Sequence, residues 1–448
     1  MDLELKIQNF GPIDEATIQV GRFTVFAGPN NTGKTFVAKI LYSMLGAINA
    51  NPALVFFEVQ AGLIYRILEL NRDFGATGER ARSDLRRALQ KTDSILREAT
   101  SSRVSQNELD VFKSVQPEVI AEIEAMKTHF QILKNNIERE EDRSEVLQLH
   151  GYIKDSIDAL DKVFRNEERM IDFGWALKFH QNVSGNFQVS DISQLKGVGD
   201  SPMSFSIPGL GDLEETNDFM FSPDPQIVQN PQSFSKAFYL ESQLYWKLKN
   251  PLESIKLDSS PSSWASLNGV PSYFYDVVVA LRRQRIDHPF AEIHKGLHNA
   301  IGGEIVLSEA GDLEFQTSGG SFPLSLTSAG VANMGMLALL IERGVLEPGS
   351  FLFIDEPEAN LHPAWQVEMA EFLFELARQG VHVVISTHSM TILKWLEVHL
   401  KKETEDRALV RLNKFPPDAE WNDDMDAVMA EAKQSLTQPF SDLYITGL

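Results

Sequence analysis

Cysteine is absent from this sequence of 448 residues. Its absence excludes disulfide bonds, thiolate metal ligands and cysteine nucleophiles, and is typical of proteins in the cytoplasm. The sequence also lacks an apolar run close to the roughly 20 residues that cross a bilayer, so we expect no membrane-spanning helix and no membrane partner. The opening stretch, MDLELKIQNF, carries acidic residues and no positively charged region before an apolar stretch. We therefore expect no signal peptide and a cytoplasmic location.

Positive charge is scarce as well. The 41 Lys and Arg residues are outnumbered by 63 Asp and Glu, which gives a formal net charge of -22. An acidic surface repels nucleic acid at long range, so DNA binding would need a local basic face. Two basic clusters could provide one, although solvated helix faces have the same composition. The clusters contain Arg80, Arg82, Arg86, Arg87 and Lys91, and Arg282, Arg283 and Arg285.

A glycine-rich loop follows a short apolar strand at residues 23–27 and precedes a helical pattern at residues 36–45. Glycines let such a loop turn tightly so that its N–H groups point at phosphate oxygens, and the helix N-terminus adds partial positive charge. Lys34 can bridge the β- and γ-phosphates of ATP, and the Thr35 hydroxyl can ligate Mg²⁺. The loop fits G-x-x-x-x-G-K-[ST] at every fixed position and predicts an ATP site. It consists of Gly28, Pro29, Asn30, Asn31, Thr32, Gly33, Lys34 and Thr35.

Two carboxylates, Asp355 and Glu356, directly follow the apolar run FLFI. A buried strand of this kind delivers them to the edge of an α/β sheet where ligands bind. Asp355 is suited to hold Mg²⁺, and Glu356 is suited to orient and deprotonate an attacking water. The apolar run at residues 381–385 ends in STHS in the same way, so His388 is expected at the same edge, within reach of a γ-phosphate. His382 lies inside that strand, and we interpret it as structural.

Small and hydroxylic residues, LTSAG, stand between the phosphate loop and the acidic strand, and a helix is predicted after them at residues 332–343. Such residues at a helix N-terminus form an anion site. Within its own subunit this site need not reach the phosphates, and it can instead complete the site of a facing copy.

The ordered set GPNNTGKT, LTSAG, FLFIDEPEANLHPAWQ and VVISTHS resembles the ABC-ATPase heads of the RecF, Rad50 and OLD group. It is most similar to bacterial AAA family ATPases of the AAA15/AAA21 kind. The resemblance covers residues 1–50 and 235–400. It implies an α/β fold, a mixed β-sheet with flanking helices, interrupted by a helical, coiled-coil-like insertion.

The resemblance also implies roles for single residues. ATP binding falls on residues 28–35, Mg²⁺ ligation on Thr35 and Asp355, and catalysis on Lys34, Glu356 and His388. Ser328 and Gly330 match the signature residues that contact ATP in the opposite subunit, while Val331 replaces a polar residue there. Gln243 is the candidate for the glutamine that follows the strand at residues 236–242. The implied assembly is a homodimer through ATP-sandwiched heads, which could pair into higher oligomers.

Several functions are compatible with these motifs. The first is an ATP-hydrolysing regulatory subunit of a bacterial anti-phage defence system, as in PARIS-type or Septu-type systems, which controls a separate effector such as a nuclease. The alternative is a DNA-binding repair ATPase similar to RecF. A transporter subunit is disfavoured by the long interval between loop and signature, and a non-enzymatic scaffold is disfavoured by the presence of both Glu356 and His388. The acidic residues Asp423, Asp424 and Asp426 are interpreted as a solvated helix start.

The expected organisation has five parts. Residues 1–50 and 236–400 form the ATPase head, residues 51–183 a helical arm, residues 184–235 a loop-rich insertion and residues 401–448 a C-terminal tail. Within the arm, apolar residues three and four apart predict two antiparallel helices joined by a charged turn at residues 138–145. Pro117 is placed at the start of the first of these helices. A hairpin is predicted around Gly311.

Overall fold

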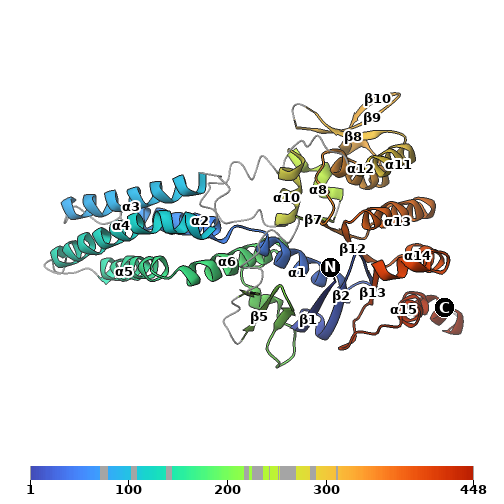
Figure 1. Cartoon of the computed structure of the whole chain (residues 1–448), viewed down its shortest axis with the longest axis horizontal. Coiled ribbons are helices and arrows are strands. Elements are labelled where there is room, and N and C mark those ends of the chain that lie inside the picture. The colour runs from blue at the N-terminus through green and yellow to red at the C-terminus, as the bar shows by residue number, and fades with distance from the viewer. Residues whose placement is uncertain are drawn as a thin grey trace. The chain divides into compact units, whose positions relative to one another are not determined.

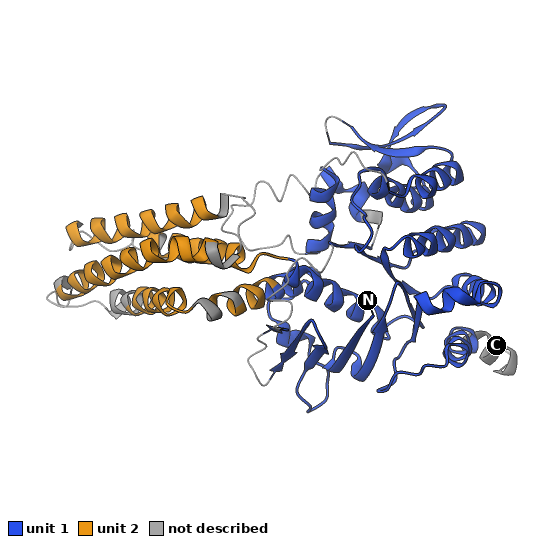
Figure 2. Cartoon of the chain, viewed as in Figure 1, with its two compact units in different colours: residues 1–49, 179–448 blue, residues 50–178 orange. Residues whose placement is uncertain are grey.

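The computed structural model describes most of the chain. The described residues are 2–70, 79–101, 108–137, 144–215, 221–224, 236–241, 243–250, 252, 269–282, 289–308 and 311–446. Arg283, Arg285 and residues 138–143 of the predicted charged turn lie outside them. The chain divides into two compact units, one of residues 1–49 and 179–448 and one of residues 50–178 (Figure 2).

A parallel five-stranded sheet lies at the centre of the first unit, with the strand order β13-β3-β12-β11-β7. Its strands are rich in Val, Ile, Leu and Phe because both faces of a parallel sheet are covered by helices. The strands are β3 (Phe23–Ala27), β7 (Ala237–Leu240), β11 (Phe351–Asp355), β12 (His382–Thr387) and β13 (Val410–Lys414).

Helices cover both faces of this sheet (Figure 1). The helix α1 (Lys34–Ile48) packs against β7, β11 and β12, and α13 (Pro363–Arg378) packs against β12 on the other side. Next to α13 lies α14 (Met390–Lys402), which Ser389 caps by accepting hydrogen bonds from the N–H groups of Thr391 and Ile392. These caps fix where α14 starts and thereby where His388 stands.

An antiparallel sheet with the order β2-β1-β4-β5-β6 forms a second layer. The strands β1 (Leu3–Phe10) and β2 (Ile13–Val20) turn at Gly11. The stretch expected to be loop-rich supplies the remaining three strands. They are β4 (Ser204–Ile207), β5 (Gly211–Glu214) and β6 (Phe221–Pro223), preceded by a 3-10 turn, η1 (Ile192–Leu195).

A three-stranded antiparallel sheet precedes the signature segment, the LTSAG stretch at residues 326–330. It consists of β8 (Glu304–Leu307), β9 (Leu313–Thr317) and β10 (Gly320–Pro323), with the predicted turn at Gly311 between the first two. Two helices pack beside it, α11 (Ala291–Ile301) and α12 (Ala329–Glu342). The shorter helices α8 (Gln243–Lys247), α10 (Ser272–Leu281) and η4 (Leu324–Leu326) complete this part of the unit.

The segment after residue 400 is built into the head. Beyond the 3-10 turn η5 (Thr404–Leu409), β13 pairs in parallel with β3, and α15 (Met425–Thr446) packs against β13. The expected boundary at residue 400 is therefore wrong, because the central sheet includes β13 as its edge strand. The sequence VRLNK does not indicate a strand of the central sheet, because only one face of an edge strand has to be apolar.

The second unit is a bundle of long helices. Four of them are α2 (Pro52–Leu70), α3 (Glu79–Ser101), α4 (Glu108–Ile137) and α5 (Ser144–Phe164), and α6 (Glu167–Phe187) follows in the chain. The core contains a cluster of buried aromatic rings, among them Phe57 and Phe112, which stack with centroids 6.3 Å apart.

The helices α4 and α5 run antiparallel, as the apolar spacing predicts. Gln116 donates to the Phe164 carbonyl at 2.6 Å, and Lys127 donates to Asp161 at 2.7 Å, so the partner number falls as the residue number rises. The predicted helix start at Pro117 is wrong, because α4 begins at Glu108 and continues through the proline. The apolar face of the helix outweighs the one backbone hydrogen bond that proline forfeits.

No single helix in the described part of the chain is long and apolar enough to cross a bilayer, although α1 and the first part of α2 pass such a test jointly as a bent pair.

Candidate nucleotide-binding site

Three strands of the central sheet end at one edge, and each is followed by a predicted motif. The register pairs Asp355 of β11 with Ser386 of β12, and Ala27 of β3 with Thr387 of β12. Because the strands are parallel, their carboxyl ends carry the phosphate loop, the two acidic residues and His388 to the same edge. The strand β12 lies between the other two, so His388 follows the middle strand.

The phosphate loop, residues 28–35, has the backbone of an anion cradle. Asn31 and Gly33 have positive φ angles of 62° and 100°, and the Thr32 hydroxyl donates to the Pro29 carbonyl at 2.9 Å. Alternating backbone conformations of this kind turn successive N–H groups inward. Gly28 is packed so closely that an added Cβ would lie 2.2 Å from the Phe415 carbonyl oxygen. The first glycine of the motif is thus required by packing as well as by phosphate approach.

Lys34 lies inside this loop and is 6% exposed. Its ammonium donates to the carbonyl oxygens of Gly28, at 2.8 Å, and Pro29, at 2.5 Å. Burial lowers the pKa of Lys34, and the carboxylates of Asp355, Glu356 and Glu358 oppose that shift. The lysine is therefore a buried cation already at the phosphate loop, where anionic phosphate oxygens are better acceptors than carbonyl groups.

Thr35 and Asp355 meet across 320 residues of sequence. The Thr35 hydroxyl donates to the Asp355 carboxylate at 2.8 Å. Burial raises the pKa of Asp355 to about 6, although the bond from Thr35 acts in the opposite direction. A cation that approaches this desolvated carboxylate would stabilise its charged form. Such perturbed groups are concentrated at functional sites.

The donor set fits Mg²⁺. A hydroxyl and a carboxylate are the hard oxygen ligands that this ion prefers, and it usually takes only one or two protein oxygens beside phosphates and waters. The described residues contain no group of three or more His, Cys, Asp or Glu that could hold a metal by themselves. Thr35 and Asp355 are the residues that would hold the ion.

Glu356 and His388 face each other at this edge. Glu356 has a φ angle of 52°, and its N–H donates to the Ser386 carbonyl at 2.8 Å, which ties the turn after β11 to β12. Its Oε1 lies 3.4 Å from Nδ1 of His388, and the two side chains are 42% and 43% exposed. Glu356 is thus held by its backbone, and both side chains are accessible to a ligand. Strained backbone of this kind is concentrated at functional sites.

Comparison with known proteins gives one family match. Residues 239–394, which include β11 and β12, match the family model described as "AAA domain, putative AbiEii toxin, Type IV TA system". Residues 239–394 thus carry an AAA-type ATPase domain. Together with the parallel sheet and its loop, this confirms the predicted fold class, an α/β ABC-ATPase head with a helical insertion.

The structural comparisons are weaker. A chain titled "Crystal structure of the SmcHead bound to the C-winged helix domain of ScpA" is 10% identical, with a TM-score of 0.35 over 88% of this chain and 90% of that one. The "SMC head domain from Thermotoga maritima" is 12% identical, with a TM-score of 0.33 over 88% of this chain and 92% of that one. No curated protein matches significantly. At these TM-scores the likenesses bear on neither partners nor assembly.

The signature segment of the ATPase domain begins α12 three residues earlier than predicted. Ser328 is its N-cap, and the Ser328 hydroxyl accepts the Val331 N–H at 3.3 Å. Gly330 is buried against the turn after β11, since an added Cβ would lie 2.9 Å from the Asn360 carbonyl oxygen. Ser328 itself is exposed, and Leu326 just before it is 76% exposed. Gln243 is the first residue of α8, and its side chain lies outside what the structure describes.

Two acidic residues of the ATPase domain were not predicted from the sequence. Glu241, after β7, pairs with Lys39 at 3.2 Å and accepts a hydrogen bond from the Tyr273 hydroxyl. Glu358, in the turn after β11, is only 5% exposed. The signal for Glu241 was its place directly after a strand of the parallel sheet. Glu358 gave no signal, because acids in a Pro- and Asn-containing turn are normally solvated.

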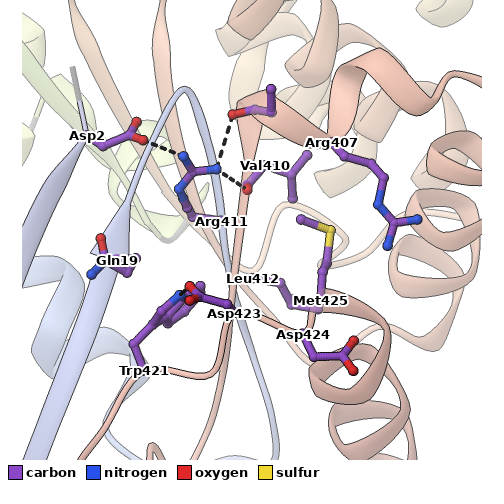
Figure 3. Close-up of a pocket in the computed structure, with 11 residues that line it drawn as sticks. Asp2, Gln19, Arg407, Val410, Arg411, Leu412, Trp421, Asp423, Asp424 and Met425 are labelled. Carbon is purple, nitrogen blue, oxygen red and sulfur yellow. Dashed lines mark hydrogen bonds and ion pairs between the residues drawn. The ribbon is translucent and has the colours of Figure 1, made fainter.

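A separate cavity of about 650 Å³ lies between β1, β2, β13 and the start of α15 (Figure 3). Its arginines are already neutralised: Arg411 bonds Asp2 and two carbonyl groups, and Arg407 pairs with Asp426 at 2.7 Å. Asp424 caps α15 by accepting the N–H groups of Asp426 and Ala427. This cavity thus offers no free cation among its described lining residues, and it differs from the phosphate loop in that respect.

Proposed function

We propose that the chain hydrolyses ATP with Mg²⁺ in a site that two copies of it share, and that closure and opening of the paired heads act as a conformational switch. The observation that carries the proposal is the convergence of Lys34, Thr35, Asp355, Glu356 and His388 on one edge of one sheet. Residues from three separate segments meet there, each with the chemistry that phosphoryl transfer requires.

Each residue has a step that its position supports. Lys34 would exchange its two carbonyl acceptors for phosphate oxygens. Glu356, half exposed and directly after β11, would accept a proton from the attacking water. His388 would donate a hydrogen bond to the γ-phosphate. Held by Thr35 and Asp355, Mg²⁺ would supply charge neutralisation at the phosphates.

The exposure of Ser328 supports the shared site. Its hydroxyl accepts the neighbouring Val331 N–H, and the residue is exposed. An exposed serine at a helix N-terminus is suited to an anion that another molecule presents. The exposed side chain of Leu326 beside it offers apolar surface to the same partner. Paired dimers could form larger assemblies.

The family match supports the regulatory role. The family description names a toxin of a toxin–antitoxin system, which is closer to defence than to repair. The described residues contain no acidic cluster for a nuclease metal, since Asp424 caps a helix and Asp426 pairs with Arg407. We therefore place the effector on a separate polypeptide. The repair alternative loses support because Lys91 and Arg87 pair with acids, Glu122 and Asp84.

The test is a pull-down with Glu356→Gln protein in the presence of Mg²⁺ and ATP. This variant should bind ATP, turn it over at least 100-fold more slowly than wild type, and accumulate as an engaged dimer with its effector attached. Lys34→Ala is the control, since it should stay monomeric with or without ATP. Equal size and equal partner content with and without ATP would refute the switch, and unchanged turnover in the glutamine variant would refute the assigned chemistry.

A further inference from the structure

Glu358 is a buried carboxylate without a cationic partner at hydrogen-bonding distance among the described residues. Burying a charged group costs free energy unless hydrogen bonds compensate. Oε1 of Glu358 accepts two of them, from the Thr387 hydroxyl at 2.7 Å and the His388 N–H at 2.9 Å. Oε2 is equally buried and has no hydrogen-bond partner in the described part of the chain. All the described hydrogen bonds of this carboxylate are thus made by Oε1, which fixes it against the end of β12.

The backbone around Glu358 is fixed from the signature helix. The side-chain amide of Asn333, in α12, donates to the Pro357 carbonyl at 3.1 Å and to the Ala359 carbonyl at 3.5 Å. These two carbonyl groups flank Glu358 on either side. The carboxylate is therefore held in place by a residue that lies one turn after the signature.

Glu358 also contacts the segment of residues 387–389 at the end of β12. The Thr387 hydroxyl that donates to Glu358 also accepts the Ser389 N–H at 3.0 Å, so it shapes the turn that carries His388. Nδ1 of His388 lies 3.4 Å from Oε1 of Glu356 and 3.6 Å from Oε1 of Glu358. Two carboxylate oxygens thus lie near the same imidazole nitrogen.

We propose that Glu358 is the positioning residue of His388, an inference that rests on the proposed function. When Glu356 turns toward an attacking water, it leaves Nδ1 of His388. Oε1 of Glu358 is held by its bonds from Thr387 and the His388 N–H, so it stays 3.6 Å from Nδ1 and becomes the nearer carboxylate for the Nδ1–H group. The imidazole is then held with Nε2 directed at the nucleotide, because the hydrogen bond at one ring nitrogen determines the state of the other.

The test combines kinetics with a double-mutant cycle. Glu358→Gln keeps the size of the side chain and removes its charge. It should lower kcat roughly 10–100-fold, the range seen when a residue that orients a functional histidine is lost, while KM for ATP stays unchanged. The double variant Glu358→Gln/His388→Ala should be no slower than His388→Ala alone, since both changes disable the same group. Fully additive losses, or a change in KM with constant kcat, would overturn the proposal.

A matched control is Asp406→Asn. Asp406 is also a buried carboxylate that contacts a histidine, His399, at 2.7 Å, but it lies near the C-terminal end of α14. This variant should lower the melting temperature and leave kcat as in wild type. If Glu358→Gln does not fold, Thr387→Val replaces it, because the isosteric change removes one of the two donors to Oε1. A kcat loss that is again non-additive with His388→Ala would uphold the proposal, and unchanged kcat would overturn it.

A second readout separates this inference from the proposed function. The imidazole resonances of His388, assigned by comparison with His388→Ala, should shift in Glu358→Gln protein and stay in place in Asp406→Asn protein. If wild type shows no ATP hydrolysis, the proposed function fails, and the resonances still decide. A shifted His388 signal upholds the positioning contact, and an unmoved signal refutes it.

Discussion

Gly28→Ala is the substitution whose effect follows most directly from the structure. The new Cβ would lie 2.2 Å from the Phe415 carbonyl oxygen, whereas real Cβ atoms stay at 3.0 Å or more, so the two backbones must separate by about 0.8 Å (3.0 minus 2.2). Phe415 directly follows β13, and its N–H donates to the Ala27 carbonyl at 2.7 Å. The shift therefore opens the junction between β3 and β13 immediately before the phosphate loop.

The expected cost has two parts. Overpacking a filled site costs about 1–3 kcal/mol, and weakening the hydrogen bond from Phe415 adds about 1 kcal/mol. Unfolding in urea should thus show a loss of about 2–4 kcal/mol relative to wild type. Because the Gly28 carbonyl also accepts a hydrogen bond from Lys34, a fluorescent ATP analogue should bind roughly tenfold or more weakly, the equivalent of 1.4 kcal/mol.

Gly319→Ala is the matched control. Gly319 lies in the turn between β9 and β10, where the nearest atom to an added Cβ is the Thr317 hydroxyl oxygen at 3.6 Å, an ordinary contact. This variant should stay within about 0.5 kcal/mol of wild type and bind the analogue equally well. A Gly28→Ala protein that matches the control in both measurements would refute the packing argument.

Three further predictions concern single residues. Lys34→Ala should lose ATP binding by at least 100-fold in equilibrium titration, and unchanged affinity would remove Lys34 from the site. Ser328→Arg should abolish turnover while a single head still binds the ATP analogue; an active variant would refute a site shared between copies. Burial lowers the pKa of His382 from 6.5 to about 4. The unfolded chain thus binds the proton first as pH falls, and stability is lost from pH 6.5 downward through pH 4. Between pH 8 and pH 5 this amounts to about 2 kcal/mol, and His382→Phe should remove that part of the pH dependence in urea titrations.

The sequence was sufficient wherever function depends on local pattern. Lys34, Thr35, Asp355 and His388 were each placed by a strand that ends in polar residues, and parallel pairing then brings them to one edge. The resemblance extended this to Ser328, whose exposed position at the start of α12 is compatible with the predicted role.

What the sequence could not supply depends on contacts between distant segments. Glu358 is buried only because the turn after β11 packs under the end of β12 and is held by Asn333. The edge strand β13 has an unremarkable composition, and it was assigned to a tail because nothing near it in the sequence indicates its partner, β3. Pro117 was misplaced for the opposite reason, because a strong local rule was outweighed by the packing of α4.

The order of the central sheet gives β12 a particular place in the proposed switch. It lies between β3, which leads into the phosphate loop, and β11, which ends in Asp355. Through Thr387 and His388 its end is bonded to Glu358, and the carbonyl groups that flank Glu358 are bonded to Asn333 of the signature helix. A displacement of α12 by a facing copy would therefore reach His388 through two consecutive hydrogen-bonded contacts within one subunit. Asn333→Ala should then reduce the stimulation of turnover by dimer formation while leaving ATP binding to a single head intact. Equal stimulation in this variant, measured as turnover per head against protein concentration, would show that the signature and the histidine act independently.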